Sequence, residues 1–461
     1  MVLLILVWLV IAVVVARLIY TYFLSPLASI PNAGILAPIS RLHWEFPTEF
    51  QGKLTLELPK LHKKLGPLVR IGPNQVSFYS LEVYKTVHAP NSPFVKDPRV
   101  YSQFVQDGHP ALFSITDPKE HAQRRRHMGI LFNRSKVPAL TDMMVETIDR
   151  FSEYLGTASQ KGSINLVPTS KFAFGNTIGA IDSLNAGKEL GIIQKNDAKS
   201  SKMPVLSSIT SSQQFDRWAD EQFAATMDSE KAPSLSFLKV MANHRISEQS
   251  ALSEAKEMLG PGTDTTSATL AHILYALSLN QAFQNELVSD LEAAGWPTDM
   301  TALESTPRLK ACVKEGIRWT GAAAAMLPRI VPKGGYVLAG KNLPGGTMIS
   351  SSPIWYLRDE VAFPDPERYR PTRWRQDTDE STALRDDYYI PFSKGASTCI
   401  GNHFAYLELF LAVSQVLRRY HIRPGDDLAD LDVAHEAILP PRREWVAAVP
   451  IGRLTVRLER R

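Results

Sequence analysis

Apolar positions are most concentrated at the start of the chain. Residues 2–16 are wholly apolar, Arg17 interrupts the run once, and residues 18–24 continue it. As a helix, about twenty such residues span the hydrocarbon core of a bilayer. No basic segment precedes the run and no small-residue cleavage site is clear, so the pattern favours a retained anchor over a cleaved signal peptide.

Prolines follow the apolar run. Pro26, Pro31 and Pro38 oppose helix formation and predict a stiff linker over residues 25–40. The basic residues that follow the run predict that the remaining chain lies on the cytoplasmic side of a membrane. We therefore expect a transmembrane anchor over residues 1–24, then the linker, and then one large domain over residues 41–461.

Hydrophobic periodicity in this domain predicts mainly helices. One helix is expected over residues 247–280 and another over residues 402–420. A third opens at Pro118, with Thr116 or Asp117 as its N-cap.

Small β regions are expected between the helices. Residues 68–79 predict two short strands around a Gly-Pro-Asn turn, glycines separate short strands up to residue 351, and residues 453–458 form a last strand. Residues 185–236 are polar and lack apolar periodicity, so we place no element there. The expected fold class is mainly α with small β regions.

Composition narrows the function classes. Hydrophobic residues make up 44% of the chain, charged residues 21%, and the net charge is +4, without a basic block interleaved with aromatic residues. This argues against a nucleic-acid partner. The two cysteines, Cys312 and Cys399, cannot form a disulfide framework and fit a reducing compartment.

The candidate chemistry centres on residues 392–401, Phe-Ser-Lys-Gly-Ala-Ser-Thr-Cys-Ile-Gly, which precede the last predicted helix. Unpaired N–H groups and the helix dipole favour a thiolate at Cys399, which makes it a candidate metal ligand. Gly395 and Gly401 let the backbone lie close to a flat cofactor. A small buried apolar cysteine is the alternative.

Residues 260–266, Gly-Pro-Gly-Thr-Asp-Thr-Thr, lie inside the predicted helix 247–280. A proline and glycines in a helix interior cost stability, so we expect a break there. The break could be a plain kink or an opened groove with a function.

Two further patterns carry little information by themselves. Glu315 and Arg318 form an i,i+3 pair, which is common on helix surfaces. His121 and Arg125 share a face of the third helix, in a basic run that also suits a solvated surface.

Phe392-x-x-Gly395-x-x-x-Cys399-x-Gly401 resembles the haem-binding loop of the cytochrome P450 family. The other motifs follow in that family's order, and the resemblance covers residues from about 30 to 461. It implies a cytochrome P450 fold, with haem b as the cofactor and the Cys399 thiolate as axial iron ligand.

The resemblance also assigns roles to residues outside the loop. It implies that His121, Arg125 and Arg329 bind the haem propionates. Asp264 and Thr265 would deliver protons beside bound dioxygen.

A charge cluster is implied near the cysteine loop. Glu315, Arg318 and Arg373 would fix that loop, with Arg373 taken from Pro-Thr-Arg-Trp at residues 371–374. The similar tetrapeptide at residues 366–369 is a less suitable candidate, because no tryptophan follows its arginine.

Two positions depart from the family's pattern. Pro261 stands at a small position of the helix motif, and Ser397 stands where the family usually has an arginine that pairs with a propionate. We expect Arg125, His121 and Arg329 to suffice for haem retention, with Lys394 as an additional cation.

The resemblance implies a membrane-anchored haem-thiolate monooxygenase in the endoplasmic reticulum membrane, single-pass, with a cytoplasmic catalytic domain. NADPH would supply electrons through cytochrome P450 reductase, which Lys394, Arg418 and Arg419 could dock, and cytochrome b5 is a second candidate donor. The chain is most similar to fungal microsomal members of secondary metabolism, so we expect a small, largely apolar organic substrate.

Two alternatives remain open. A reductase-independent haem-thiolate isomerase or dehydratase is one, although such members often lose the Asp-Thr pair that this chain has. A degenerate, non-catalytic haem- or ligand-binding protein is the other, motivated by Ser397, Pro261 and the polar region over residues 185–236.

Overall fold

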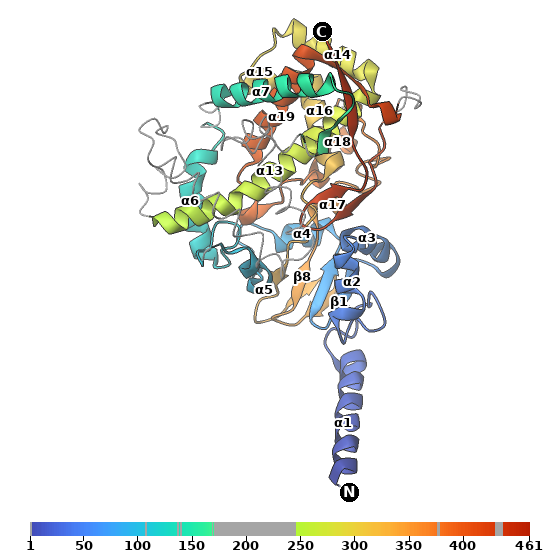
Figure 1. Ribbon diagram of the computed structural model, residues 1–461. Helices are drawn as coiled ribbons and strands as arrows, with labels where there is room; N and C mark the ends of the chain where they lie inside the picture. The colour runs from blue at the N-terminus through green and yellow to red at the C-terminus, as the bar shows by residue number, and fades with distance from the viewer. Residues whose placement is uncertain are drawn as a thin grey trace.

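One helix projects from a mainly helical body in the computed structural model (Figure 1). The structure describes residues 2–106, 108–135, 138, 141–167, 169, 246–375, 379–428 and 437–461. The polar region over residues 185–236 lies outside these ranges.

The described helices are α1 (Val2–Ile19), α2 (Glu45–Phe50), α3 (Leu54–Leu65), α4 (Leu81–Val87), α5 (Pro98–Tyr101), α6 (Pro118–Phe132), α7 (Thr141–Ser159), α13 (Glu248–Leu279), α14 (Gln281–Ala293), α15 (Met300–Glu304), α16 (Pro307–Thr320), α17 (Pro353–Tyr356), α18 (Asp379–Tyr388) and α19 (Asn402–Arg419). The described strands are β1 (Leu68–Gly72), β2 (Gln75–Phe78), β3 (Val95–Lys96), β4 (Ile164–Asn165), β5 (Arg329–Ile330), β6 (Tyr336–Leu338), β7 (Lys341–Leu343), β8 (Met348–Ser350), β9 (Tyr420–Pro424), β10 (Arg442–Glu444), β11 (Ala448–Pro450) and β12 (Thr455–Arg460). The predicted fold class, mainly α with small sheets, is confirmed.

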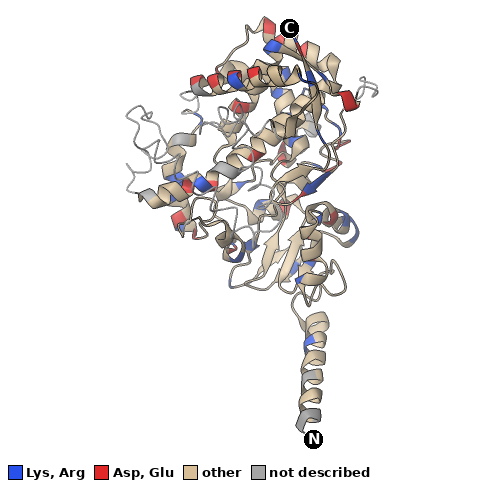
Figure 2. Cartoon of the chain, viewed as in Figure 1, with Lys and Arg blue, Asp and Glu red and all other residues tan. Residues whose placement is uncertain are grey.

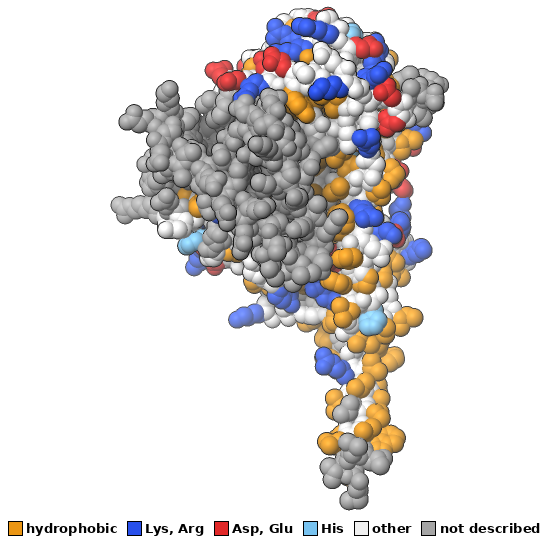
Figure 3. Space-filling view, in the orientation of Figure 1, with side chains coloured by type: hydrophobic (Ala, Val, Ile, Leu, Met, Phe, Trp, Pro, Cys, Tyr) orange, Lys and Arg blue, Asp and Glu red, His pale blue; other side chains and the backbone are white. Residues whose placement is uncertain are grey.

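Helix α1 carries the apolar run away from the body. Arg17 is its single charged residue, and the remaining described side chains are uncharged (Figure 2). Residues Ile5–Leu24 have a mean hydropathy of 2.3 and are 0% buried, so the segment is long and apolar enough to cross a membrane. Figure 3 shows hydrophobic side chains along the projecting helix.

The segment over residues 25–40 packs on the body and is no free linker. Leu27 and Ile30 are each 2% exposed and belong to a hydrophobic core. The Arg70 N–H donates to the Pro31 carbonyl at 2.7 Å, and the Ala33 N–H donates to the Arg70 carbonyl at 2.9 Å. The prolines oppose a regular helix, and the two bonds to Arg70 join the segment to the edge of β1, whereas other backbone groups bond within the segment in turns.

Five strands form the larger sheet, in the order β1-β2-β8-β5-β3. The predicted strands over residues 68–79 are β1 and β2, with Leu68 opposite Phe78 in an antiparallel pair. Strand β3 pairs with β5 and places Lys96 opposite Arg329. The last strand, β12, lies in a separate sheet with β9 and β4, so it does not join the strands around residues 329–351.

Helix starts agree with the predicted caps. The Asp117 carboxylate accepts from the Lys119 and Glu120 N–H groups at 2.9 and 2.8 Å, which selects Asp117 over Thr116 as the N-cap of α6. Ser247 caps α13 by accepting from the Ser250 N–H at 3.2 Å.

The break expected inside α13 is absent, because the helix is continuous from Glu248 to Leu279 through Pro261. Pro261 is exposed, which leaves room for its ring. Leu270, Leu274 and Leu277 are fully buried in the main core, where α13 packs against α16 and α19. This packing outweighs the local cost of the proline.

Candidate active site

A cavity of about 870 Å³ lies between segments that are far apart in the sequence. Its walls come from the end of α4, from β3, α6 and β5, and from the loop before α19. Of the predicted site residues, His121, Arg125, Arg329 and Cys399 line it, together with Lys394 and Ser397. The fold thus brings three separate stretches of the sequence to one space: α6, β5 and the cysteine loop.

The loop that carries Cys399 is shaped by glycines. Gly395 has φ +70°, and a Cβ there would overlap the His88 carbonyl oxygen, so a larger residue cannot occupy it without a shift. The Cys399 N–H donates to the Phe392 carbonyl at 2.9 Å, which closes the loop, and Gly401 precedes the first residue of α19. Phe392, Gly395 and Gly401 therefore position the cysteine backbone.

The thiol of Cys399 is exposed to the cavity. Surrounding protein atoms raise its pKa above the ordinary value by desolvation; a backbone hydrogen bond from Gly401 and the charge of Arg125 lower it by less. Desolvation therefore opposes the local N–H groups and the charge that favour a thiolate. A coordinated metal cation would deprotonate the thiol.

Cations dominate the cavity wall. None of the described residues that line it is acidic, whereas several are basic: Lys96, His121, Arg125, Arg126, Arg329, Lys394 and His403. Burial lowers the pKa of His121 to about 3, and repulsion from Lys96, Arg125 and Arg329 contributes. Such a site is stable only when an anion enters it.

Two residues of this wall were missed by sequence reasoning. Lys96 is buried, its Nζ donates to the Leu112 and Phe113 carbonyls at 3.1 and 2.8 Å, and burial lowers its pKa to about 7. His88 is 4% exposed at the end of α4. No local sequence pattern distinguishes either residue. Lys96 reaches the cavity through the pairing of β3 with β5, and His88 reaches it because the end of α4 packs against the cysteine loop.

Asp264 and Thr265 are not among the residues that line this cavity. Both lie in the middle of α13, and the Thr265 hydroxyl donates to the Pro261 carbonyl at 2.8 Å. The structure therefore does not bring this pair to the cations.

The predicted charge cluster is formed by α16 and the segment before α18. Glu315 is fully buried and accepts from Arg318 at 2.8 and 2.9 Å and from Arg373 at 3.0 Å. Burial raises the pKa of Glu315, but the two guanidinium groups lower it by more, so it is held below the usual range. Arg368 of the alternative tetrapeptide contributes only a backbone carbonyl to Arg318, at 3.2 Å.

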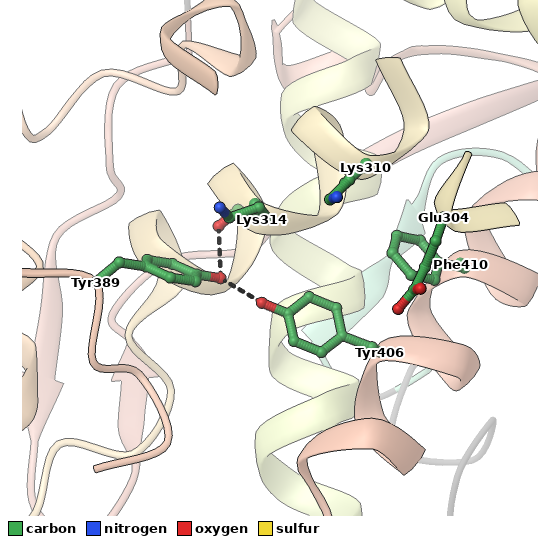
Figure 4. Close-up of a pocket in the computed structure, with 6 residues that line it drawn as sticks. All are labelled: Glu304, Lys310, Lys314, Tyr389, Tyr406 and Phe410. Carbon is green, nitrogen blue, oxygen red and sulfur yellow. Dashed lines mark hydrogen bonds between the residues drawn. The ribbon is translucent and has the colours of Figure 1, made fainter. Parts of the chain in front are cut away.

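A second cavity, of about 210 Å³, contains none of the predicted site residues (Figure 4). The Tyr389 hydroxyl lies 2.8 Å from that of Tyr406 and donates to the Lys314 carbonyl at 3.3 Å. The other lining residues are Glu304, Lys310 and Phe410. Cys312 lies elsewhere, fully buried, with its sulfur 3.1 Å from the Tyr369 hydroxyl.

Comparisons with known proteins place this geometry in a family. The sequence model described as Cytochrome P450 matches residues 219–446. The cytochrome P450 monooxygenase macH of Penicillium terrestre is 27% identical, over 88% of this chain and 89% of the relative. The cytochrome P450 monooxygenase ankB of Aspergillus thermomutatus is 27% identical, over 86% of this chain and 83% of the relative.

A relative with a named substrate is also similar. The N-acetyltryptophan 6-hydroxylase ivoC of Emericella nidulans is 24% identical, over 93% of this chain and 94% of the relative. The matches to monooxygenases extend over most of the chain and agree with the cysteine loop and the charge cluster. The chain therefore belongs to the cytochrome P450 family of monooxygenases.

Proposed function

We propose that the protein is a membrane-anchored haem-thiolate monooxygenase that oxidises a small, largely apolar organic substrate in fungal secondary metabolism. The observation that carries the proposal is the cavity that combines the Cys399 thiol with buried cations and no acidic wall residue in the described chain. The similar fungal monooxygenases support the reaction class and the setting.

The cavity residues fit haem b. Its two propionate carboxylates would pair with the cations Arg125, Arg329 and Lys394 and accept a hydrogen bond from the neutral His121 ring, and the Cys399 sulfur would bind the iron. When bound, the haem iron supplies the activation of dioxygen. Gly395 shapes the cysteine loop, because a Cβ at this position would overlap the His88 carbonyl oxygen.

We assign proton movement to Asp264 and Thr265. The Thr265 hydroxyl donates to the Pro261 carbonyl, so its oxygen lone pairs can accept a hydrogen bond. To relay a proton, the hydroxyl would turn from that carbonyl, accept a proton from a neighbour and release its own toward the haem side. Asp264 is half-buried in the same turn and would pass protons from solvent toward Thr265.

The remaining features concern location and partners. We assign α1 and the following turn as a single-pass anchor in the endoplasmic reticulum membrane, with the body over residues 41–461 in the cytoplasm. NADPH–cytochrome P450 reductase, or cytochrome b5, would donate electrons. Arg418 is exposed and suits an acidic partner, whereas Arg419 is already paired with Asp149 at 2.8 Å.

Carbon monoxide binding tests the cysteine assignment. Full-length protein in detergent, reduced and exposed to carbon monoxide, should show the red-shifted Soret band of thiolate-ligated haem. Cys399→Ser should abolish this band, and Cys312→Ser, the matched control, should retain it. A preparation without porphyrin, or an unchanged band in Cys399→Ser, would contradict the proposal.

Dependence on electrons tests the reaction class. Oxidised product should form only when NADPH and the reductase are both present. Turnover without them would instead support an isomerase or dehydratase, and haem binding without any product would support a non-catalytic protein.

A further inference from the structure

A buried histidine faces the large cavity without using either of its ring nitrogens. His88 is 4% exposed and lines the cavity. Neither Nδ1 nor Nε2 has a hydrogen-bond partner within the part of the chain that the structure describes. A buried polar group without a partner is destabilising, and a ligand that enters the cavity can supply that partner.

The ring of His88 is held in place by its neighbours. It stacks on Tyr84, with ring centroids 4.2 Å apart and an interplanar angle of 25°. The Tyr84 hydroxyl in turn lies 2.7 Å from the Ser393 hydroxyl in the cysteine loop. The imidazole is therefore fixed in orientation before any ligand binds.

His88 lies beside the position where this chain lacks an arginine. Its carbonyl packs against Gly395, two residues before Ser397, and both His88 and Ser397 line the cavity. Arg329 is close enough for its charge to act on the imidazole. His88, Arg329 and Ser397 thus line the same cavity.

We propose that His88 donates a ring N–H to a haem propionate and replaces the propionate contact that a side chain at Ser397 is too short to make. The inference rests on the proposed function, because it requires haem in this cavity. It adds a cofactor-binding residue from α4, an element outside the motifs that suggested the site.

The chemistry of the imidazole fits this role. Burial lowers the pKa of His88 well below its usual value, and the charge of Arg329 lowers it further, so the ring is neutral. A neutral imidazole has one N–H donor and adds no charge beside Arg329. A hydrogen bond to a carboxylate is also about twice as strong as one between neutral groups.

The rate of haem loss measures the proposed hydrogen bond between His88 and the propionate. Full-length His88→Phe keeps an aromatic ring to stack on Tyr84 but removes the N–H donor. Haem transfer to excess apomyoglobin should be roughly tenfold faster from His88→Phe than from wild type. An unchanged rate would overturn the proposal.

A double variant tests whether the two positions serve the same propionate. Ser397→Arg should slow haem loss more in the His88→Phe background than in the wild-type background, because it restores a lost contact. Equal effects in both backgrounds would mean independent sites and would also overturn the proposal. The red-shifted carbon monoxide band should persist in every variant, so its loss would indicate failure of the cysteine assignment instead.

Vibrational spectra give a readout that is independent of stability. The propionate bending band in resonance Raman spectra should move in His88→Phe and stay near wild type in Lys119→Arg, at an exposed residue of α6 that does not line the cavity. If His88→Phe binds no haem, His88→Leu and His88→Gln replace it, since only the second retains an N–H donor. Equal haem loss from these two variants would overturn the proposal.

Discussion

Burial alters the protonation of the acidic side chains of α13 that contact residues 111–116. Glu254 accepts from Arg124 at 2.7 Å and from the Leu112 N–H at 2.9 Å. Glu257, one turn further, accepts from the Ser114 hydroxyl at 3.0 Å, and its other oxygen has no partner among the described residues. Burial raises the pKa of Glu257 to about 8, with Glu254 contributing and Lys96 opposing.

This pKa predicts how stability depends on pH. The folded chain keeps the Glu257 proton up to about pH 8, while the unfolded chain releases it near the ordinary value of 4.5. The unfolded state therefore binds fewer protons in this window, and the free energy of unfolding falls as pH rises through it. Glu257→Gln should remove this slope and stabilise the protein at pH 8 by roughly 2–4 kcal/mol.

Urea unfolding of full-length protein at several pH values measures the effect. Glu82→Gln, at an exposed acid in α4, is the matched control and should give the wild-type slope. Lys96 titrates in the upper part of the window, so the comparison is made between variants at each pH. Parallel curves for Glu257→Gln and wild type would contradict the assignment.

Between elements, the charge cluster connects α16 to the segment before α18. Arg318 donates to the Leu357 and Pro366 carbonyls at 3.0 and 2.9 Å, besides its bonds to Glu315. The indole N–H of Trp374 also donates to Glu315, at 2.9 Å. The buried carboxylate of Glu315 thus links helix α16, the segment before α18 and the side chain of Trp374.

Removal of that carboxylate charge should be costly. Glu315→Gln leaves Arg318 and Arg373 buried without a counter-charge, so we expect a loss of about 3–5 kcal/mol in the free energy of unfolding. Glu286→Gln breaks the 2.9 Å pair with Arg308, whose acid is 57% exposed, and should cost at most about 1 kcal/mol. Chemical denaturation of both variants measures the difference, and similar losses would argue against a central role for Glu315.

At the scale of the whole molecule, the N-terminal region consists of two parts that differ in how they contact the body. Helix α1 makes an isolated apolar projection, whereas residues 25–40 are part of the body through Leu27 and Ile30 (Figure 1). We infer that the boundary between a membrane anchor and the folded domain lies before residue 25, because residues 25–40 pack on the body.

Two deletions test this boundary. Removal of residues 2–24 should release the protein from membranes in carbonate extraction and leave the unfolding midpoint of the body nearly unchanged. Removal of residues 2–40 should also lower the midpoint, because Leu27 and Ile30 each contribute about 1.5–3 kcal/mol by burial. Equal midpoints would show that the segment does not stabilise the body.

The sequence alone determined the features that depend on neighbours along the chain. Periodicity and capping predicted α13, α19 and the start of α6 at Pro118, and motif spacing predicted the family and the partners of Glu315. These signals are local, since a cap or an i,i+3 pair is formed within one turn of helix.

Only the tertiary structure decided the features that depend on burial. The continuity of α13 through Pro261, the packing of residues 25–40, and the desolvation that opposes ionisation of Cys399 cannot be derived from local sequence. The tertiary structure also decided the positions of His88 and Lys96, because α4 and β3 carry these residues to the cavity. Desolvation and core packing arise from residues distant in the sequence, and at these positions their free energies exceed the local preferences.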